Sequence, residues 1–348
     1  MKLLITTQAV DRNDPILGFF HGWLLEFAKH FERVEVICLR EGVHELPENV
    51  HVHSLGKEHG ENRLKYFFRF YAYFFKIFYR EKVDFVFFHM GAIYNILAAP
   101  FFLLRKVQNT KFIWWKTHGM LNVTGKCAAL FVDEIVTAGS NSFNMRSHKV
   151  RVVGHAVDTE HFVFKEKQIP DIVRTMVVGR VTPIKKIEVA IDSVARCKQI
   201  IERTVLLDIY GPVTDVKYKA VLDAQIVGKQ LSKDVTFCGA VNPQNMPVLY
   251  GVYDILLHPA YEAGFDKVVL EAMASGVCPV TSIPSFKGIL ESYGLFVSPH
   301  DVDGYARAVQ RLINMSPNEL SGLQKSLRTL VAEAHSLSTL TKRIFGII

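Results

Sequence analysis

The sequence has few cysteines, and none of them is arranged to bind zinc. The five, scattered over 348 residues, are Cys38, Cys127, Cys197, Cys238 and Cys278. Their number is odd, and no Cys-x-x-Cys pair occurs. This pattern favours a reducing compartment and argues against a disulfide framework or a metal site. A chain of this length buries enough surface to fold without such links.

Long apolar runs are also missing. No stretch reaches the length of about 18 apolar residues that would predict a membrane-spanning helix. The first residues, MKLLITTQAVDRNDP, turn polar after five positions, whereas a secretory signal needs a longer apolar region. We therefore expect a cytoplasmic protein. The most apolar segment, residues 62–82, is interrupted by Arg69, Lys76 and Arg80.

Acidic residues are outnumbered: 34 Asp and Glu stand against 41 Lys and Arg, which gives a net charge of +7. This surplus suits an anionic partner, such as a nucleotide, a lipid surface or a nucleic acid. No zinc finger or RNA-recognition motif is recognisable, so we expect no nucleic-acid partner. Segment 62–82 has too many aromatic residues for one buried stripe, and its basic residues could meet lipid phosphates. The alternative is a core helix whose basic side chains snorkel to solvent.

Short β-branched runs alternate with helical patterns along the whole chain, which predicts an α/β protein with parallel sheets. The expected strands of the first half are 2–7, 33–39, 50–55, 83–89, 111–117, 134–139 and 150–155. The pattern restarts with 175–181, 204–211, 235–241, 254–260, 278–283 and 294–299. We therefore predict two Rossmann-like, doubly wound domains, 1–157 and 158–334. Ligands of such sheets bind beyond the carboxyl ends of the strands.

Basic residues follow the first strand of the second half. Arg180 lies at the strand end, and Lys185 follows a turn that contains Pro183. A guanidinium fork and an ammonium group at such a turn are suited to phosphate oxygens. A solvated surface pair is the alternative for isolated basic residues, but the strand–turn–helix context favours phosphate binding.

The stretch YEAGFDKVVLEAMASG, residues 261–276, predicts a helix over 267–275 with Asp266 as its N-cap and Gly276 after its end. An apolar stripe is expected of a core helix. It does not account for Glu271, because a buried carboxylate is costly without partners. Sugar hydroxyls could be those partners. Gly264 would allow close backbone approach, and the helix N-terminus offers N–H groups to a phosphate.

The order GRV…K, LDIYGP, VTFCGAV and HPAYEAGFDKVVLEAMASG resembles the GT4 glycosyltransferases, which have the GT-B fold of two Rossmann-like domains facing each other across a cleft. The resemblance covers nearly the whole chain and is strongest over residues 176–300. Residues 334–344 resemble the family's terminal segment, so about 335–348 are expected to cross back to the first domain. The resemblance implies retaining transfer of a sugar from a UDP- or GDP-linked donor, without a metal or other cofactor. The implied acceptor is a glycan or a lipid-linked molecule.

The resemblance also implies site residues. Arg180 and Lys185 match the family's diphosphate-binding pair, and Glu271 matches the glutamate that holds the ribose hydroxyls. The helix start that faces the diphosphate matches Phe265, Asp266, Lys267 and Val268.

The chain departs from the family at one carboxylate. The family's Glu-x7-Glu pattern places a sugar-binding glutamate where this chain has Ala263, and Glu262 lies one residue earlier. Asp266 also replaces a common glycine. Either Glu262 reaches the sugar through a shifted loop, or backbone groups take over. A catalytically inactive nucleotide- or sugar-binding relative is therefore the alternative function. A Rossmann oxidoreductase is disfavoured, since no Gly-x-Gly-x-x-Gly follows the first strand.

Two residues of the first half are candidates for the donor side. Gly18 stands where a loop becomes a helix, and the matching family loop lies at the cleft; a plain loop-to-helix junction is the alternative. His118 follows the strand 111–117, where the family has a histidine that hydrogen-bonds the donor sugar. His89, also at a strand end, is a weaker candidate.

No well-placed carboxylate pair for a covalent route is visible. The resemblance therefore implies front-face transfer, in which the leaving diphosphate accepts the acceptor's proton and the basic residues stabilise its charge.

Overall fold

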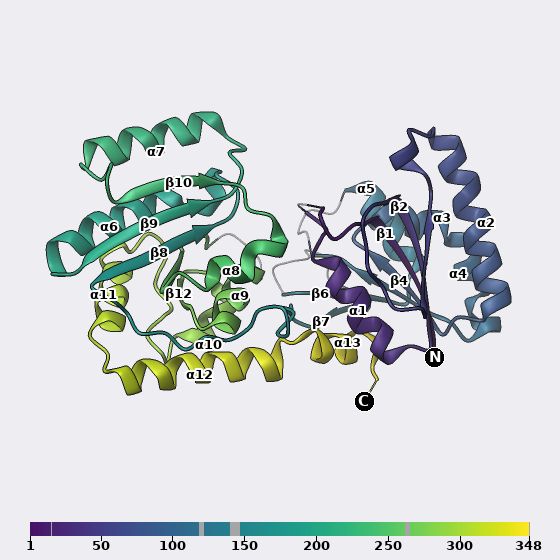
Figure 1. The fold of residues 1–348 in the computed structure, drawn as a ribbon. Coiled ribbons are helices and arrows are strands. Elements are labelled where there is room, and N and C mark those ends of the chain that lie inside the picture. The colour runs from purple at the N-terminus through teal and green to yellow at the C-terminus, as the bar shows by residue number, and fades with distance from the viewer. Residues whose placement is uncertain (15, 118–121, 140–146, 262–264, 348) are drawn as a thin grey trace. The chain divides into compact units, whose positions relative to one another are not determined.

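The chain forms two compact units. The computed structural model describes residues 1–347 except 15, 118–121, 140–146 and 262–264. Unit 1 comprises Met1–His155 and Leu337–Ile348, and unit 2 comprises Ala156–Ser336. The limits predicted from the sequence are 157 and 335. The segment 337–347 thus belongs with the N-terminal unit (Figure 1).

Unit 1 is built on a seven-stranded sheet in which every strand pairing is parallel. Its strands are β1 (Lys2–Val10), β2 (Arg33–Glu41), β3 (Val50–Ser54), β4 (Phe85–His89), β5 (Lys111–Trp115), β6 (Glu134–Thr137) and β7 (Val150–Val152). The order across the sheet is β3-β2-β1-β4-β5-β6-β7. The expected strands are all present, and several end earlier than predicted.

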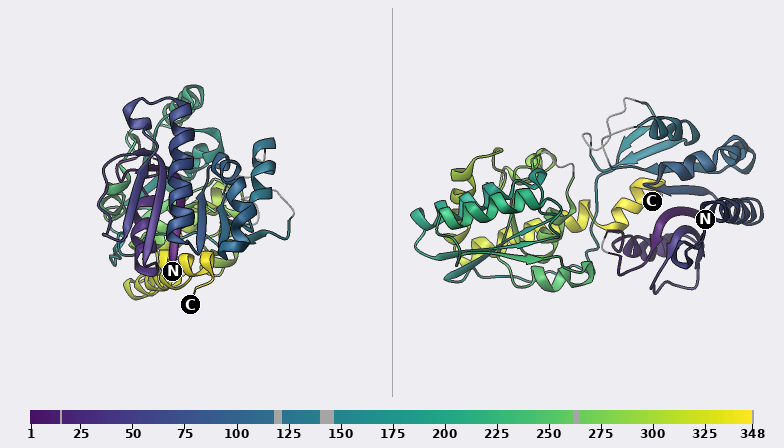
Figure 2. Two further views of the ribbon diagram at one scale, coloured as in Figure 1. Left: turned by 90° about the vertical axis from the view of Figure 1, so that its right-hand side faces the viewer. Right: turned by 90° about the horizontal axis from the view of Figure 1, so that it is seen from above.

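The helices of unit 1 are α1 (Phe20–His30), α2 (Arg63–Glu81), α3 (Ala92–Leu97), α4 (Ala99–Gln108), α5 (Val123–Ala128) and α13 (Leu337–Phe345). Side chains of β4 alternate between the two sheet faces. Phe85 and Phe87 pack against Phe345 of α13, with ring centroids 5.2 and 5.6 Å apart. Phe88 points to the opposite face and joins the core formed by α2 and α4. Helices α1 and α13 lie side by side (Figure 2).

Unit 2 contains a five-stranded sheet that is also parallel throughout. Its strands are β8 (Ile172–Val178), β9 (Thr204–Tyr210), β10 (Val235–Gly239), β11 (Ile255–His258) and β12 (Cys278–Thr281). The helices are α6 (Ile187–Ile200), α7 (Val216–Gly228), α8 (Met246–Tyr250), α9 (Lys267–Ser275), α10 (Lys287–Leu290), α11 (Val302–Ile313) and α12 (Pro317–Ala334). The expected strand at 294–299 is wrong, since only Phe296 forms a bridge there, to Thr281.

The strand order β10-β9-β8-β11-β12 places a topological switch point in unit 2 between β8 and β11. From β8 the chain continues to β9 on one side, and later returns to β11 on the other side (Figure 1). In open α/β sheets the crevice beyond such a point is where ligands bind. The residues that follow β8, together with those that end β11, are therefore the place to look for a site.

Candidate functional site

Lys185 lies close to the end of β8 because a glycine makes room for it. After β8, Gly179 has a φ of +148°, which only glycine adopts readily. A Cβ atom added there would lie 2.8 Å from Lys185 Cε. Lys185 ends a short 3₁₀ turn, Pro183–Lys185, and α6 starts after Lys186. The lysine stem therefore crosses over the Gly179 backbone and returns its ammonium group to the sheet edge.

The ammonium group of Lys185 forms an ion pair with Asp266, and the two side chains are only 15% and 17% exposed. The same carboxylate oxygen, Oδ2, lies 3.1 Å from Nε2 of His258. His258 is the last residue of β11 and is buried. Its other ring nitrogen, Nδ1, is buried and has no hydrogen-bond partner among the described residues. Residues from the ends of β8 and β11 thus meet at the start of α9.

Asp266 occupies the N-cap position of α9, as predicted, but its side chain makes no capping hydrogen bond. The carboxylate contacts Lys185 and His258 instead. Burial alone would raise the pKa of Asp266, but the neighbouring Lys185 charge and the His258 hydrogen bond hold that pKa well below its usual range. Asp266 is therefore an ionised acceptor, and Nε2 of His258 must carry the hydrogen that it donates.

Glu271 lies inside α9, and only 6% of the residue is exposed. The hydroxyl of Tyr250 donates to Glu271 Oε2 at 3.1 Å and lies 3.2 Å from the backbone oxygen of Val268. On the other side, Lys267 Nζ is 3.7 Å from Glu271 Oε1. Burial raises the pKa of Glu271, against the opposing effects of Lys267 and Tyr250. The sequence predicted that this carboxylate needs partners, and Tyr250 is one that the sequence analysis did not identify.

Two further cations belong to the segment that joins β8 to α6. Arg180 is exposed, and its guanidinium has no ion-pair or hydrogen-bond partner among the described residues. Lys186, at the N-cap position of α6, has a φ of +51°, and its Nζ lies 5.4 Å from the centroid of the Tyr261 ring. Tyr261 in turn contacts His300 edge-on. Of the three cations between β8 and α6, Lys185 is the one that forms an ion pair among the described residues.

The remaining predicted residues divide into three groups. Phe265 packs its ring against Phe286, with centroids 4.5 Å apart, and Val268 is buried at the start of α9. Gly18 belongs to unit 1, where a Cβ would lie 2.6 Å from the backbone oxygen of Asp14; this close packing within the loop accounts for a glycine at that position. The last group, His118, Glu262 and Gly264, lies outside the described residues.

His89, the weaker candidate of the first half, is a buried side chain at the end of β4. Its Nδ1 lies 3.0 Å from Thr7 Oγ1, and its ring stacks on Phe20 with centroids 3.9 Å apart. Burial and the nearby His155 lower the pKa of His89 to about 3. This histidine is therefore neutral at physiological pH, and its environment is that of a core residue.

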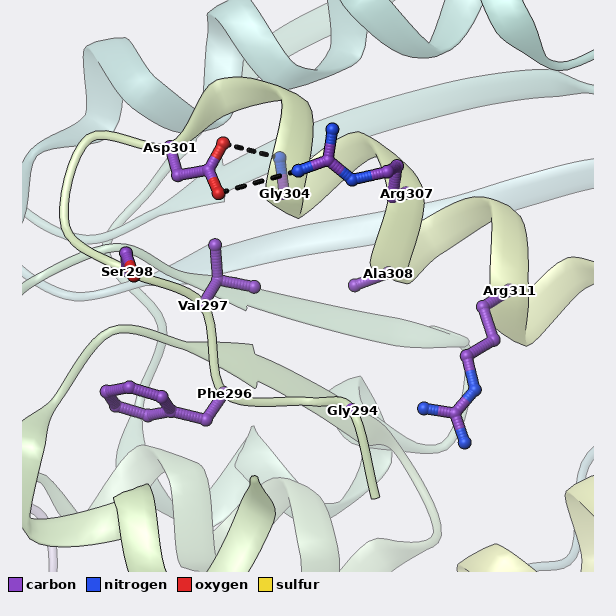
Figure 3. A pocket seen from close by; sticks show the side chains of 9 residues that line it. All are labelled: Gly294, Phe296, Val297, Ser298, Asp301, Gly304, Arg307, Ala308 and Arg311. Atoms are coloured by element: carbon purple, nitrogen blue, oxygen red, sulfur yellow. Dashed lines mark hydrogen bonds and ion pairs between the residues drawn. The ribbon is translucent and has the colours of Figure 1, made fainter. Parts of the chain in front are cut away.

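A separate cavity of about 330 Å³ lies between the 294–298 segment and α11 (Figure 3). Its two arginines already have partners. Arg307 is 3.6 Å from Asp301 Oδ2, and Arg311 donates to the backbone oxygen of Tyr293 at 2.7 Å. None of the residues that surround Lys185 lines this cavity. We therefore place the candidate site at the Lys185–Asp266 pair and not here.

The helix α2 is buried on one face and exposes apolar residues on the other. Phe70, Phe74, Ile77 and Phe78 are buried, and α4 packs alongside through Phe101, 4.5 Å from Phe74. The exposed apolar residues, here called the α2–α4 face, are Leu64, Phe67, Phe68 and Phe75 on α2 and Leu103, Leu104 and Val107 on α4.

Among the described residues, no helix is long and apolar enough to cross a bilayer. No group of three or more His, Cys, Asp or Glu residues suited to a metal ion occurs in that part of the chain either.

Residues 173–315 match the family model described as "Glycosyl transferases group 1". Among curated proteins, the O-antigen chain mannosyltransferase RfbU of Salmonella typhimurium is 27% identical over 183 residues, which are 52% of this chain and 49% of RfbU. The O-antigen chain mannosyltransferase B of Escherichia coli is 32% identical over 89 residues, 25% of this chain and 23% of that protein. The match thus spans about half of RfbU's length and less of the second relative.

Solved structures resemble the chain over nearly its whole length. Anabaena HepE in complex with UDP and glucose has a TM-score of 0.71 at 16% identity and covers 99% of this chain and 98% of its own. Sucrose-phosphate synthase from Thermosynechococcus elongatus has a TM-score of 0.72 at 15% identity, with 100% and 98% covered. At such identities the likeness concerns the fold. It confirms the predicted GT-B class, two α/β units with parallel sheets.

Proposed function

We propose that this protein is a GT4-like glycosyltransferase that moves a sugar from a nucleotide-sugar donor to a glycan or lipid-linked acceptor. The observation that carries the proposal is the Lys185, Asp266, His258 and Glu271 cluster at the switch point of unit 2. It lies within the 173–315 region that matches group 1 glycosyl transferases. RfbU, a mannosyltransferase by name, and HepE, solved with UDP and glucose, support a nucleotide-sugar reaction.

In the proposed complex the donor diphosphate lies at the N-terminus of α9. The first N–H groups of a helix are unpaired and attract anions. Arg180 and Lys185 add positive charge from the β8 side, and Glu271 accepts hydrogen bonds from ribose hydroxyls one turn further along. Glu271 is suited to this role because it is buried, fixed by Tyr250, and has acceptor capacity left on its two oxygens.

We propose retaining, metal-independent transfer. As the bond between sugar and diphosphate breaks, negative charge grows on the leaving phosphate oxygen. Arg180 and Lys185 stabilise that charge, and preorganised stabilisation of this kind is often the largest catalytic contribution. The leaving oxygen accepts the proton of the acceptor hydroxyl, which attacks from the same face. A UDP- or GDP-linked hexose fits this scheme, with no cofactor. The anomeric configuration of the first product, followed by NMR, tests retention, and an inverted product would contradict it.

The proposal is tested first by ligand binding. Thermal unfolding of the full chain is measured with UDP, GDP, ADP and their sugar conjugates, since a bound ligand raises the melting temperature. The nucleotide that stabilises the chain is then titrated against Arg180→Ala and Lys185→Ala. Each variant should weaken binding by roughly tenfold or more, because charge-assisted hydrogen bonds contribute about 1.5–3 kcal/mol. Lys217→Ala, which removes an exposed lysine of α7, is the control. Unchanged binding in both site variants would refute the site, and transfer to an acceptor would exclude the inactive-relative alternative.

We further propose that a lipid-linked acceptor is met at the anionic surface of the cytoplasmic membrane. The α2–α4 face supplies apolar contact, and Arg63, Lys65, Lys76 and Arg80 are exposed on α2 around it. Apolar side chains in the interface, with basic residues at lipid phosphates, are how interfacial helices bind.

Liposome co-sedimentation tests this contact. Binding should increase with the fraction of anionic lipid and should decrease several-fold for Phe68→Ser. Val227→Ser is the matched control, because Val227 on α7 and Phe68 are both 68% exposed. Binding that is independent of anionic lipid, or equal in the two variants, would contradict the proposal.

A further inference from the structure

The positive charge of Lys185 is already balanced inside the candidate site. Asp266 is the balancing group, and the pair is about five-sixths shielded from solvent, with exposures of 15% and 17%. For a site that binds a diphosphate this is unexpected, because a carboxylate next to the ammonium group opposes an anionic ligand. The inference below rests on the proposed function.

Helix formation does not require this carboxylate to lie where it does. An aspartate at an N-cap ordinarily accepts a hydrogen bond from an N–H of the first turn. Asp266 has the position but makes no such bond. Its Oδ2 faces Lys185 from one side and His258 Nε2, at 3.1 Å, from the other. The side chain is thus fixed by a residue from the turn after β8 and by the last residue of β11, and not by its own helix.

The neighbours of the carboxylate favour its charged form. The groups that interact with it are Lys185, His258 and, more weakly, Glu271 and Tyr250; Lys267 pairs with Glu271. Burial favours the neutral acid, but Lys185 and His258 outweigh it and lower the pKa of Asp266 well below its ordinary value. A fixed negative charge therefore lies at the start of α9.

Such a charge acts differently on the donor and on the by-product. In a nucleotide sugar the terminal phosphate is esterified, so it lacks the last ionisable oxygen. In the free nucleoside diphosphate that oxygen titrates with a pKa near 6 and adds almost one negative charge at pH 7.5. At an effective dielectric constant of about 20, one unit charge several Å away changes affinity by about tenfold or more. The extra charge would lie at the phosphate nearest to Lys185.

We propose that Asp266 is a specificity-determining residue that makes the site prefer the nucleotide sugar to the free nucleoside diphosphate. The carboxylate weakens the binding of the more negative by-product more than that of the donor. It keeps Lys185 in place while limiting how tightly the site holds the leaving group after transfer. Release of the nucleoside diphosphate is then faster than it would be from an uncompensated lysine.

The test compares dissociation constants for UDP and UDP-glucose, and for GDP and GDP-mannose, by calorimetry on the full chain at pH 7.5. Asp266→Asn should lower the dissociation constant of the free diphosphate by about tenfold and that of the sugar conjugate clearly less. The ratio of the two dissociation constants should therefore change at least threefold. The shift should shrink at high salt because ions screen the interaction. Asp223→Asn on α7, where Asp223 is 52% exposed and pairs with Lys219, is the control and should leave the ratio unchanged.

A ratio that is the same in Asp266→Asn and in the wild-type chain would overturn the inference. If Asp266 had a purely structural role, its replacement would weaken the binding of both ligands in proportion and leave the ratio of their dissociation constants unchanged. That outcome would therefore also count against the proposal. If Asp266→Asn fails to fold, Asp266→Ser takes its place, because serine removes the charge and is a favourable N-cap. Failure of the proposed function has another signature, in which the wild-type chain binds neither nucleotide nor conjugate.

Discussion

Two glycines that follow neighbouring strands allow a sharp test of how Lys185 is positioned. Gly179 follows β8 and Gly211 follows β9, and their φ angles are +148° and +147°. Alanine at either position meets the same backbone strain. The atoms that the new methyl group would meet are different: at Gly179 it meets Lys185 Cε at 2.8 Å, and at Gly211 the backbone oxygen of Gly179 at 1.9 Å.

The expected magnitudes follow from this difference. Backbone strain of this kind costs about 1–3 kcal/mol. In Gly179→Ala the lysine side chain can rotate away, so strain is nearly the whole loss of stability. Lys185 then leaves Asp266, and nucleotide affinity should fall roughly ten- to hundredfold, the equivalent of one charge-assisted hydrogen bond. In Gly211→Ala no side chain can yield, and the ends of β8 and β9 must separate. We expect a loss above about 4 kcal/mol, which belongs to the severe class of substitutions.

The assay can follow the two units separately. The three tryptophans, Trp23, Trp114 and Trp115, all belong to unit 1. Tryptophan fluorescence during urea unfolding therefore reports on unit 1, while circular dichroism reports on both. Both substitutions should shift the circular-dichroism transition and leave the fluorescence transition nearly unchanged. Nucleotide titration by calorimetry on Gly179→Ala completes the experiment.

One result would refute the reasoning directly. If Gly179→Ala retains wild-type nucleotide affinity, the position of Lys185 over Gly179 does not matter for binding. Equal losses of stability in the two variants would show that backbone strain, and not the contacts of the methyl group, decides the outcome.

Two further perturbations probe buried polar groups. His89 has a pKa of about 3 in the folded chain and about 6.5 when unfolded. The unfolded state thus binds more protons between these values, and the free energy of unfolding should fall by up to about 1.4 kcal/mol per pH unit below pH 6.5. His89→Gln should flatten this slope in fluorescence-detected urea unfolding, and an unaltered slope would contradict the assignment. Tyr250→Phe removes a hydrogen bond from Glu271 and should lower the melting temperature of unit 2 by roughly 3–8 °C; no change by circular dichroism would show that another group replaces the hydroxyl.

The strands could be predicted from the sequence because each is a short, β-branched run between helical patterns. Both sheets appear where the sequence placed them, and α9 begins and ends as its flanking Asp266 and Gly276 indicate. The strand predicted at 294–299 is not formed, because an apolar run of that length also suits an edge segment that pairs through one residue. The spacing of apolar residues alone cannot distinguish a full strand from such an edge segment.

For the candidate site, the sequence could indicate residues but not the contacts between them. Arg180, Lys185 and Glu271 stand out by residue type and by their places after strands or inside an apolar helix. The Lys185–Asp266 pair joins residues 81 positions apart, and Tyr250 reaches Glu271 across 21 positions. Such pairs depend on strand order, which sequence spacing does not contain. His258 falls within the expected strand 254–260, but its contact with Asp266 depends on the fold bringing the start of α9 back to the end of β11.

The place of α13 in unit 1 has a consequence for synthesis on the ribosome. Phe345 fills a space between Phe27, Phe31 and Phe87, and Arg151 of β7 donates to the backbone oxygens of Arg343 and Ile344. These residues are translated after the whole of unit 2. The N-terminal half therefore emerges first with part of its aromatic core uncovered, and it must wait for the far end of the same chain. Nascent unit 1 is a predicted client of chaperones until translation passes residue 345.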